Sequence, residues 1–514
     1  MRRSIICMTV LVFAIGVASA QTPNTITVQA SEPTIVISKH IYGHFAEHLG
    51  RCIYDGFYVG EDNKQIPNIN GVRKDVVDAL KVMKIPNLRW PGGCFADTYH
   101  WKDGIGEKSK RPTIVNQWWG GVTENNSFGT HDFLNMCELL GAEPYISGNV
   151  GSGTVQEFAD WIQYTNFKGQ SPMSKLRNEN GRPQPWNVKF WGVGNEAWGC
   201  GGNMTPEHYA NLYRQFATYM GGASSSKIFR VASGASVSDY NWTEVMMREI
   251  PHHLMEGVAL HHYSVIDWEN KGSASDFTET QYFQIMKAAF RMEELVTRHS
   301  TIMDKYDPAK KIALFVDEWG GWYNVEPETN PGFLFQQNTM RDAMIAGITL
   351  NIFNNHADRV RGANLAQAIN VLQSVILTKG DKMILTPTYH VMEMYNVHQN
   401  AKLLPLTIKS GEYALNNEKL PAVSASASID NSGAGHISIV NIDMHQSQEI
   451  SIIINGSKFK NVKGRILTSG KVTDHNTFDA PKEIQPQEFK GARFDGGVLK
   501  IKIPPVSVVV LELM

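Results

Sequence analysis

The stretch Lys189–Trp198, KFWGVGNEAW, decides the expected fold, because polar residues come directly after a short buried strand. Phe190 and Val193 belong to an aromatic and β-branched run bounded by glycine, which is typical of a strand. Glu196 follows Asn195 and lies between two tryptophans. Because apolar surroundings favour the neutral form of a carboxyl, we interpret Glu196 as a proton donor. An ordinary surface acid in a loop after a strand is the alternative.

A second stretch, Ile312–Trp322, IALFVDEWGGW, has the same design. Its apolar run predicts a short strand of the kind buried in parallel sheets. Glu318 ends the run beside two more tryptophans, and side-chain alternation predicts that its neighbour Asp317 points away from the site. Two glutamates at the ends of two strands are the groups that glycoside hydrolysis requires.

Further polar residues fall at or beside the ends of other predicted strands. Arg89 lies within a strand and needs a partner, since an unpaired buried guanidinium is costly; a catalytic carboxylate is the expected one. Adjacent His261 and His262 point oppositely on a strand, so they do not form a metal-binding pair. The full set of strand-end residues is Glu47, Arg89, Glu196, His261, Tyr263, Glu318 and Gln367.

Strand and helix patterns alternate from residue 41 to about residue 400, which predicts an α/β fold, the eight-fold (β/α)8 TIM barrel. Active sites of such barrels lie at the carboxyl ends of the strands, where the polar residues above are found. From residue 401 to 514 the helical patterns disappear and short alternating runs such as HISIVNI take their place. These runs predict a C-terminal all-β sandwich, jelly-roll-like in type.

The N-terminus has the composition of a secretory signal peptide over residues 1–20. Arg2 and Arg3 precede an apolar run, and Ala18-Ser19-Ala20 matches a cleavage site. We therefore expect export to the periplasm or the outside of the cell, with a mature chain beginning at Gln21. An apolar run of about 13 residues is too short to span a membrane comfortably.

Composition and cysteine pattern exclude other classes of function. The net charge of −2 does not favour nucleic acid or a membrane surface as a partner. Four cysteines follow the signal segment without a CxxC or histidine-rich pattern, so no metal site is expected. Disulfides are compatible with an exported protein, but the sequence does not pair Cys52, Cys94, Cys137 and Cys200.

The motifs WGVGNE and VDEWGGW resemble the acid/base and nucleophile motifs of glycoside hydrolase family 51, the α-L-arabinofuranosidases, in clan A of the glycosidases. IYGHFAEH and RWPGGC extend the resemblance. It implies that Glu196 is the acid/base and Glu318 the nucleophile of a retaining, exo-acting enzyme that needs no cofactor. It further implies that residues 21–40 join the C-terminal sandwich, and that the protein is a homo-oligomer, often a hexamer in this family.

The resemblance also implies a sugar-binding set around the two glutamates. Its members are Glu47, Arg89, Cys94 through its main-chain amide, Asn195, His261, Tyr263, Gln367 and Trp322. The implied substrates are arabinan, arabinoxylan and their oligosaccharides, from which terminal arabinofuranose is released. Two alternatives stand beside this interpretation: an endo-β-glycanase (glucanase or xylanase) on the same barrel, and a non-catalytic glycan-binding protein.

Overall fold

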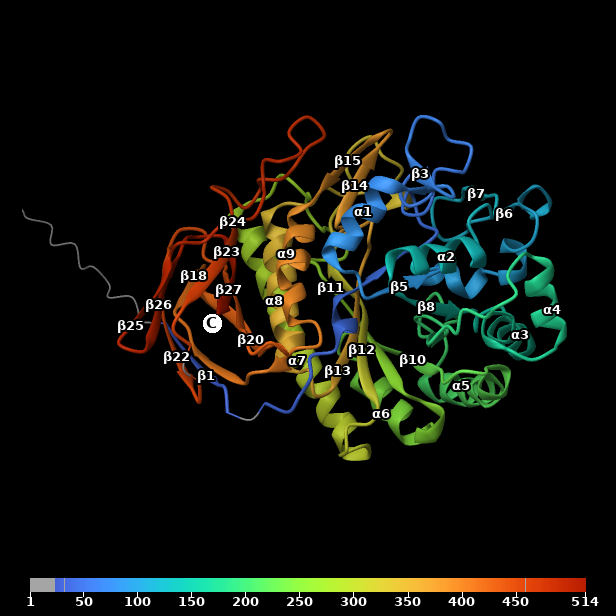
Figure 1. Cartoon of the computed structure of the whole chain (residues 1–514), viewed down its shortest axis with the longest axis horizontal. Coiled ribbons are helices and arrows are strands. Elements are labelled where there is room, and N and C mark those ends of the chain that lie inside the picture. Colours follow the sequence, from blue (N-terminus) through green and yellow to red (C-terminus); the bar gives the residue numbers. More distant parts are fainter. Residues whose placement is uncertain (1–23, 32, 458) are drawn as a thin grey trace, which may run out of the picture.

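The computed structural model, which describes residues 24–31, 33–457 and 459–514, contains a closed barrel of parallel strands and a separate two-sheet β domain (Figure 1). The barrel strands are β2 (Gly43–Phe45), β5 (Asn87–Trp90), β8 (Glu143–Gly148), β9 (Phe190–Val193), β10 (Phe229–Ser236), β11 (Gly257–Ser264), β12 (Ala313–Gly321) and β13 (Val360–Leu365). They follow this order around the barrel, and β13 pairs with β2 to close it. The predicted barrel with a C-terminal all-β domain is confirmed. The predicted signal segment, residues 1–20, lies outside the described residues.

Helices follow the barrel strands and cover the outside of the barrel (Figure 1). They are α1 (Lys74–Met83), α2 (Thr130–Leu140), α3 (Val155–Asn166), α4 (Pro172–Glu179), α5 (Pro206–Met220), α6 (Tyr240–Glu249), α7 (Glu279–Tyr306), α8 (Met340–Asn355) and α9 (Pro387–Tyr395). Short 3-10 helices lie between them: η1 (Lys39–Tyr42), η2 (Cys94–Thr98), η3 (Trp101–Gly104), η4 (Lys108–Lys110), η5 (Gly221–Ala223), η6 (His252–Leu254), η7 (Pro331–Phe333) and η8 (Asn396–His398). None of the helices in the described ranges is long and apolar enough to cross a membrane.

Large side chains fill the barrel below its polar end. The inner cluster consists of Tyr145, Phe190, Val231, Ala259, Ala313 and Phe315, contributed by β8, β9, β10, β11 and β12. A glycine at position 362 permits this packing, because a Cβ there would lie 2.1 Å from the ring of Phe315. The barrel is therefore a packed core with its open end at the strand carboxyl termini.

The β domain consists of two packed sheets and one short hairpin. One sheet has the order β17 (Leu406–Lys409), β1 (Asn24–Gln29), β22 (Gln448–Asn455), β26 (Val498–Ile503) and β25 (Ala492–Asp495). The other has the order β16 (Lys402–Leu403), β20 (Val423–Ile429), β21 (Gly435–Asn441), β27 (Ser507–Leu513), β23 (Val462–Thr468) and β24 (Gln487–Glu488). That hairpin pairs β18 (Glu412–Leu415) with β19 (Glu418–Pro421), whereas three further hairpins lie between barrel elements: β3 (Asn68–Ile69) with β4 (Val72–Arg73), β6 (Ile114–Val115) with β7 (Thr123–Glu124), and β14 (Ile376–Lys379) with β15 (Lys382–Leu385).

Helix α8 joins the two domains, since it packs on the barrel and on strands β20, β21 and β27 of the sandwich (Figure 1). Asn351 donates to the Ser424 hydroxyl at 3.2 Å, and Asn354 donates to Ser426 at 3.1 Å. Buried apolar residues of the barrel helices and of the sandwich belong to one continuous cluster. The domains are therefore held by a shared core.

Candidate active site

A small cavity of about 50 Å³ lies at the carboxyl end of the barrel strands. Most of the predicted site residues line it: Glu47, Cys94, Asn195, Glu196, Tyr263, Glu318, Trp322 and Gln367. Phe45, Leu49, Gly93, Trp119, Leu334 and Leu372 complete the wall. The two remaining predicted residues, Arg89 and His261, bond to Glu318 and Glu196 behind this wall.

Glu318 on β12 is held by two donors. The Arg89 guanidinium donates from Nη1 to Oε1 at 2.8 Å, and the Tyr263 hydroxyl donates to Oε2 at 2.8 Å. Arg89 also donates to Asn195 Oδ1 at 2.6 Å, so one guanidinium links the two motifs. Burial acts to lower the pKa of Arg89, but the charges of Asp317 and Glu318 outweigh it and raise that pKa. Both oxygens of Glu318 therefore accept from fixed donors, one of which is a permanent cation.

Glu196 follows β9 in a left-handed backbone conformation, with φ of 40°. This conformation is uncommon for a residue with a side chain, so the surrounding loop must hold it. The carbonyl of Glu196 accepts from the amides of Gly199 and Gly201, and the next amide, of Ala197, donates to Ser233 Oγ at 3.1 Å. The loop thereby directs the carboxyl of Glu196 into the pocket.

The charge state of Glu196 is set by opposing influences. Burial raises its pKa, the hydrogen bond from His261 Nδ1 to Oε1 (2.8 Å) lowers it, and the charge of Glu318 raises it again. The net shift is upward, toward a protonated carboxyl. One oxygen of Glu196 and one of Glu318 lie within 4.8 Å of each other. This upper limit for one pair of oxygens is shorter than the separation of about 6.5–9.5 Å between the carboxyl groups of inverting enzymes.

His261 bridges the two acidic motifs. Burial alone would lower its pKa, but the charge of Glu318 and hydrogen bonds to Asp317 and Glu196 raise it to about 10. An imidazolium donates from both nitrogens, here from Nδ1 to Glu196 Oε1 and from Nε2 to Asp317 Oδ1 at 3.1 Å. Since Oε1 of Glu196 accepts this bond, the proton of a neutral Glu196 belongs on Oε2. The adjacent His262 points outward and bonds the carbonyl of Ala288 on α7, as strand alternation predicts.

Asp317 is the residue that sequence reasoning misplaced. Alternation predicts that it points away from Glu318, yet it lies inside the barrel, where it accepts from His261 and, at 2.7 Å, from the Tyr145 hydroxyl. The cause is a β-bulge in β12: Ala259 of β11 pairs with Phe315, whereas His261, two residues on, pairs with Glu318, three residues on. The extra residue in β12 turns two successive carboxyls toward the interior. Burial raises the pKa of Asp317, but Arg89 and His261 lower it by more, so the net shift is downward and the ionised form is favoured.

Glu47, after β2, is a buried hub on the opposite wall. Its Oε1 accepts from the amide of Gly93 at 2.9 Å and from the indole of Trp119 at 3.0 Å. Its Oε2 accepts from Gln367 Nε2 at 2.9 Å. Burial and the charge of Glu318 raise the pKa of Glu47 to about 7. Gln367 Oε1 is buried and has no hydrogen-bond partner among the described residues.

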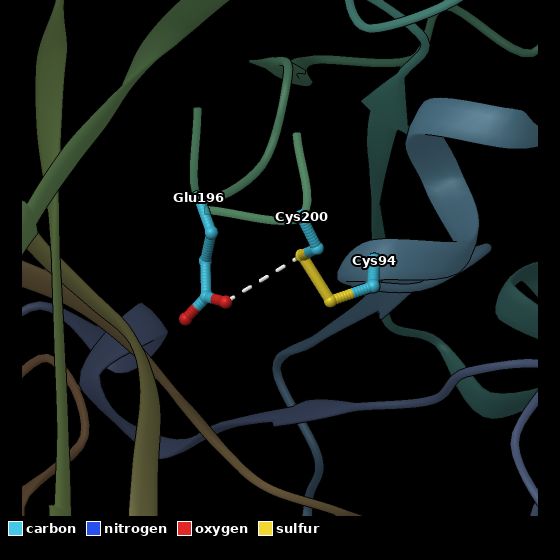
Figure 2. Close-up of side chains that lie close together, drawn as sticks. All are labelled: Cys94, Glu196 and Cys200. Atoms are coloured by element: carbon cyan, nitrogen blue, oxygen red, sulfur yellow. Dashed lines mark hydrogen bonds between the residues drawn. A yellow bond between two sulfur atoms is a disulfide. The ribbon is translucent and has the colours of Figure 1, made fainter. Parts of the chain in front are cut away.

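Helix η2 carries two features that the sequence did not assign. A disulfide joins Cys94 to Cys200 in the loop after Glu196, whereas Cys52 and Cys137 are free and buried. Asp97 accepts the Asn195 amide at 2.8 Å and the amides of Val150 and Gly151. Figure 2 shows the disulfide beside the carboxyl of Glu196, with Cys200 Sγ 3.6 Å from Oε2. This is a contact, because a disulfide sulfur carries no proton. No spacing signal in the sequence joins residues 94, 97 and 200.

Two family models match the chain. Residues 79–279 match the "Alpha-L-arabinofuranosidase 1 domain", and residues 317–507 match the "Alpha-L-arabinofuranosidase C-terminal domain". A relative from Bacteroides ovatus is 50% identical over the whole length of both chains and is named "Intracellular exo-alpha-L-arabinofuranosidase". An Aspergillus niger relative, 29% identical over 85% of this chain and 88% of its own, is named a probable α-L-arabinofuranosidase C.

The predicted export is wrong, because the relative from Bacteroides ovatus, which matches this chain over its full length, is named intracellular. The signal peptide was inferred only from charge, an apolar run and small residues within residues 1–20. Such a pattern describes the composition of a short segment, and composition alone does not fix whether a segment is recognised and cleaved.

Solved structures give the same assignment as the relatives. The family 51 arabinofuranosidase of Xanthomonas axonopodis pv. citri superposes with a TM-score of 0.94 at 47% identity, covering 96% of this chain and all of that one. An α-L-arabinofuranosidase from Thermotoga maritima, solved with arabinose, superposes with a TM-score of 0.84 at 32% identity over the same shares. The chain belongs to glycoside hydrolase family 51, the α-L-arabinofuranosidases.

Proposed function

We propose that this exo-acting α-L-arabinofuranosidase hydrolyses its substrates with retention of configuration, using Glu318 as nucleophile and Glu196 as acid/base. The observation that carries the proposal is the pair of carboxyls whose oxygens lie within 4.8 Å, one held by Arg89 and Tyr263 and the other bonded to His261. Retention needs a separation of about 5–5.5 Å between the carboxyl groups, so that the nucleophile reaches the anomeric carbon directly.

In the first step an ionised oxygen of Glu318 attacks the anomeric carbon, and the bond from that carbon to the leaving oxygen breaks. Glu196 transfers its proton from Oε2 to the leaving oxygen. In the second step Glu196 takes a proton from water, the water oxygen attacks the same carbon, and the bond to Glu318 breaks. The imidazolium of His261 stays bonded to Oε1 throughout and keeps Oε2 directed at the leaving group.

The remaining lining residues position the sugar. Glu47, Asn195 and Gln367 present oxygen and nitrogen atoms to hydroxyl groups, while Trp322 and Trp119 supply flat apolar walls. Positioning of this kind converts binding energy into rate. The small volume of the cavity, about 50 Å³, supports removal of one terminal arabinofuranose from arabinan, arabinoxylan or their oligosaccharides, whereas an endo-β-glycanase would need an extended groove. The presence of both glutamates argues against a non-catalytic glycan-binding protein.

Two measurements test the proposal. The protein should turn over nitrophenyl α-L-arabinofuranoside, and much more slowly the matching xyloside and glucoside. A mechanism-based arabinofuranosyl inactivator should label Glu318, in the peptide Ile312–Trp322, and Glu318→Ala should abolish the label and the turnover together. Label on Asp317 or Glu196, or products of inverted configuration, would contradict the assignment.

The family resemblance also favours a homo-oligomer, with a hexamer as the expected form. Light scattering measured on the protein as it leaves a size-exclusion column tests this expectation.

A further inference from the structure

We propose that reduction of the Cys94–Cys200 disulfide creates a site for a soft divalent cation such as Zn²⁺, with Glu196 as its third ligand, and that occupation of this site stops hydrolysis. The inhibition, though not the binding, rests on the proposed role of Glu196 as acid/base. The three side chains come from η2 and from the loop after β9, and they meet at the edge of the pocket (Figure 2).

The geometry matches a tetrahedral zinc site. One donor atom each from Cys94, Glu196 and Cys200 lies within 4.8 Å of the others. With Zn–S of about 2.3 Å and Zn–O of about 2.1 Å, a tetrahedral ion holds sulfur and oxygen about 3.6 Å apart and two sulfurs about 3.8 Å apart. The distance from Cys200 Sγ to Glu196 Oε2 is already 3.6 Å. The two sulfurs need only separate to van der Waals contact once their bond is broken.

The redox state decides whether the ligands exist. In the disulfide neither sulfur carries a negative charge, so the site lacks the thiolates that bind zinc. A phosphine reductant and water convert the disulfide to two thiols and the phosphine to its oxide. Zn²⁺ then displaces both thiol protons and the proton on Oε2 of Glu196, all three of which leave to the buffer, and binds two thiolates and the carboxylate of Glu196. A fourth position is left for water.

The position of Cys94 and Cys200 explains both how a reductant and an ion reach them and why a bound ion stops hydrolysis. Cys94 and Cys200 are half-buried, and Cys94 lines the pocket, so a small reductant and an ion can reach them. Because Oε1 of Glu196 accepts from His261, Oε2 is the oxygen that faces the sulfur and carries the catalytic proton. An ion on Oε2 therefore occupies the atom that serves the leaving group.

A second cluster of potential ligands is less suited to a cation. Glu196, His261 and Glu318 also have donor atoms within 4.8 Å of one another. Arg89 bonds Glu318 directly at 2.8 Å, so an added cation there would meet a fixed positive charge. The soft sulfur ligands of the first cluster also favour Zn²⁺ and Cd²⁺ over harder ions.

The experiment uses the full chain in two forms, one as the disulfide and one reduced with phosphine and freed of it under nitrogen. Cd²⁺ titration, followed by the ultraviolet charge-transfer absorption of cadmium thiolates, should show one ion per reduced chain and none per oxidised chain. Zn²⁺ should inhibit the reduced form at concentrations at least about tenfold lower than the oxidised form. Cys200→Ser should abolish the absorption, Glu196→Gln should weaken binding at least about tenfold, and the matched control Cys137→Ser should bind like the unmodified protein.

The two readouts separate this proposal from the proposed function. The absorption does not depend on turnover, so a protein that fails to hydrolyse arabinofuranosides still reports on the cation site. No Cd²⁺ absorption after reduction, unchanged absorption in Cys200→Ser, or binding without loss of activity would overturn the proposal. Should Cys200→Ser fail to fold, as judged by circular dichroism, the comparison of oxidised and reduced unmodified protein decides alone.

Discussion

In the proposed mechanism the carboxyl of Glu196 has two opposite tasks, donating a proton and later accepting one. Its pKa is raised by burial and by Glu318, and the hydrogen bond from His261 limits the rise. Glu196 is protonated, and so competent as the acid, below that pKa. Activity that depends on its proton is therefore lost as the pH rises through the pKa.

Glu196→Ala removes the proton donor and, with it, the group whose pKa sets the alkaline limit of activity. We expect kcat/KM to fall by about a hundredfold or more on substrates with poor leaving groups. The fall should be far smaller on activated aryl arabinosides, because their aryl leaving groups depart without protonation. Added azide should speed breakdown of the glycosyl-enzyme, and the alkaline limb of the pH profile should flatten. Steady-state kinetics on a series of aryl leaving groups measures all three effects. Equal losses across the series with no azide rescue would count against the acid/base role.

Tyr263→Phe tests how far one hydroxyl supports Glu318, the proposed nucleophile. Removing the bond to Glu318 Oε2 takes away one of the two donors that favour the charged carboxyl. A hydrogen bond to a charged group contributes about 1.5–3 kcal/mol, so kcat/KM should fall between about tenfold and about a hundredfold. Tyr219→Phe, at an exposed position, is the control and should leave the rate unchanged. An unchanged kcat/KM in Tyr263→Phe would show that this hydroxyl does not contribute to catalysis.

Among the elements, the strands were predictable from sequence and the local irregularities were not. Apolar runs ending in polar residues located β9 and β12 and the two glutamates, because hydrophobic periodicity reports directly on burial. The hydrophobic pattern of the sequence does not reveal the bulge in β12, which reversed the expected orientation of Asp317. Helix α8 begins at Met340, where Thr339 caps it with Asp342 in a capping box. The Cys94–Cys200 pairing depends on two distant segments meeting in space, which spacing alone does not encode.

Asp97 shows how one element positions another, since its carboxylate in η2 holds the amide directly before Glu196. In Asp97→Asn the amide nitrogen would face at least one of the three amide donors, and a buried donor left without an acceptor costs about 1–3 kcal/mol. We expect lower thermal stability and, because the loop of Glu196 loosens, a lower kcat with a smaller effect on KM. Asp160→Asn, which alters a more exposed ion pair with Lys102, is the control and should change little. A loss of stability with unchanged kcat would limit Asp97 to a structural role.

At the scale of the whole molecule, we expect the barrel and the sandwich to unfold as one unit, because α8 packs on both of them. Residues 340–354 of α8 are buried almost without interruption, although an exposed barrel helix would show one polar face. The structure shows that strands β20, β21 and β27 of the sandwich cover the second face of the helix. Sequence periodicity reports that a face is buried and not which partner buries it.

Gly347→Leu tests this coupling at the contact between α8 and the sandwich. A Cβ at Gly347 would lie 2.6 Å from Val440 Cγ2 on β21 and 3.3 Å from the Tyr395 hydroxyl, and both neighbours are buried. Overpacking of this kind should destabilise the protein by about 2 kcal/mol or more. Since the helix belongs to both cores, calorimetry should show one transition shifted downward as a whole. The same change at Gly221, where a Cβ would meet nothing within 4 Å, should leave the transition in place. Two separated transitions in Gly347→Leu, with only the sandwich shifted, would show that the domains unfold independently.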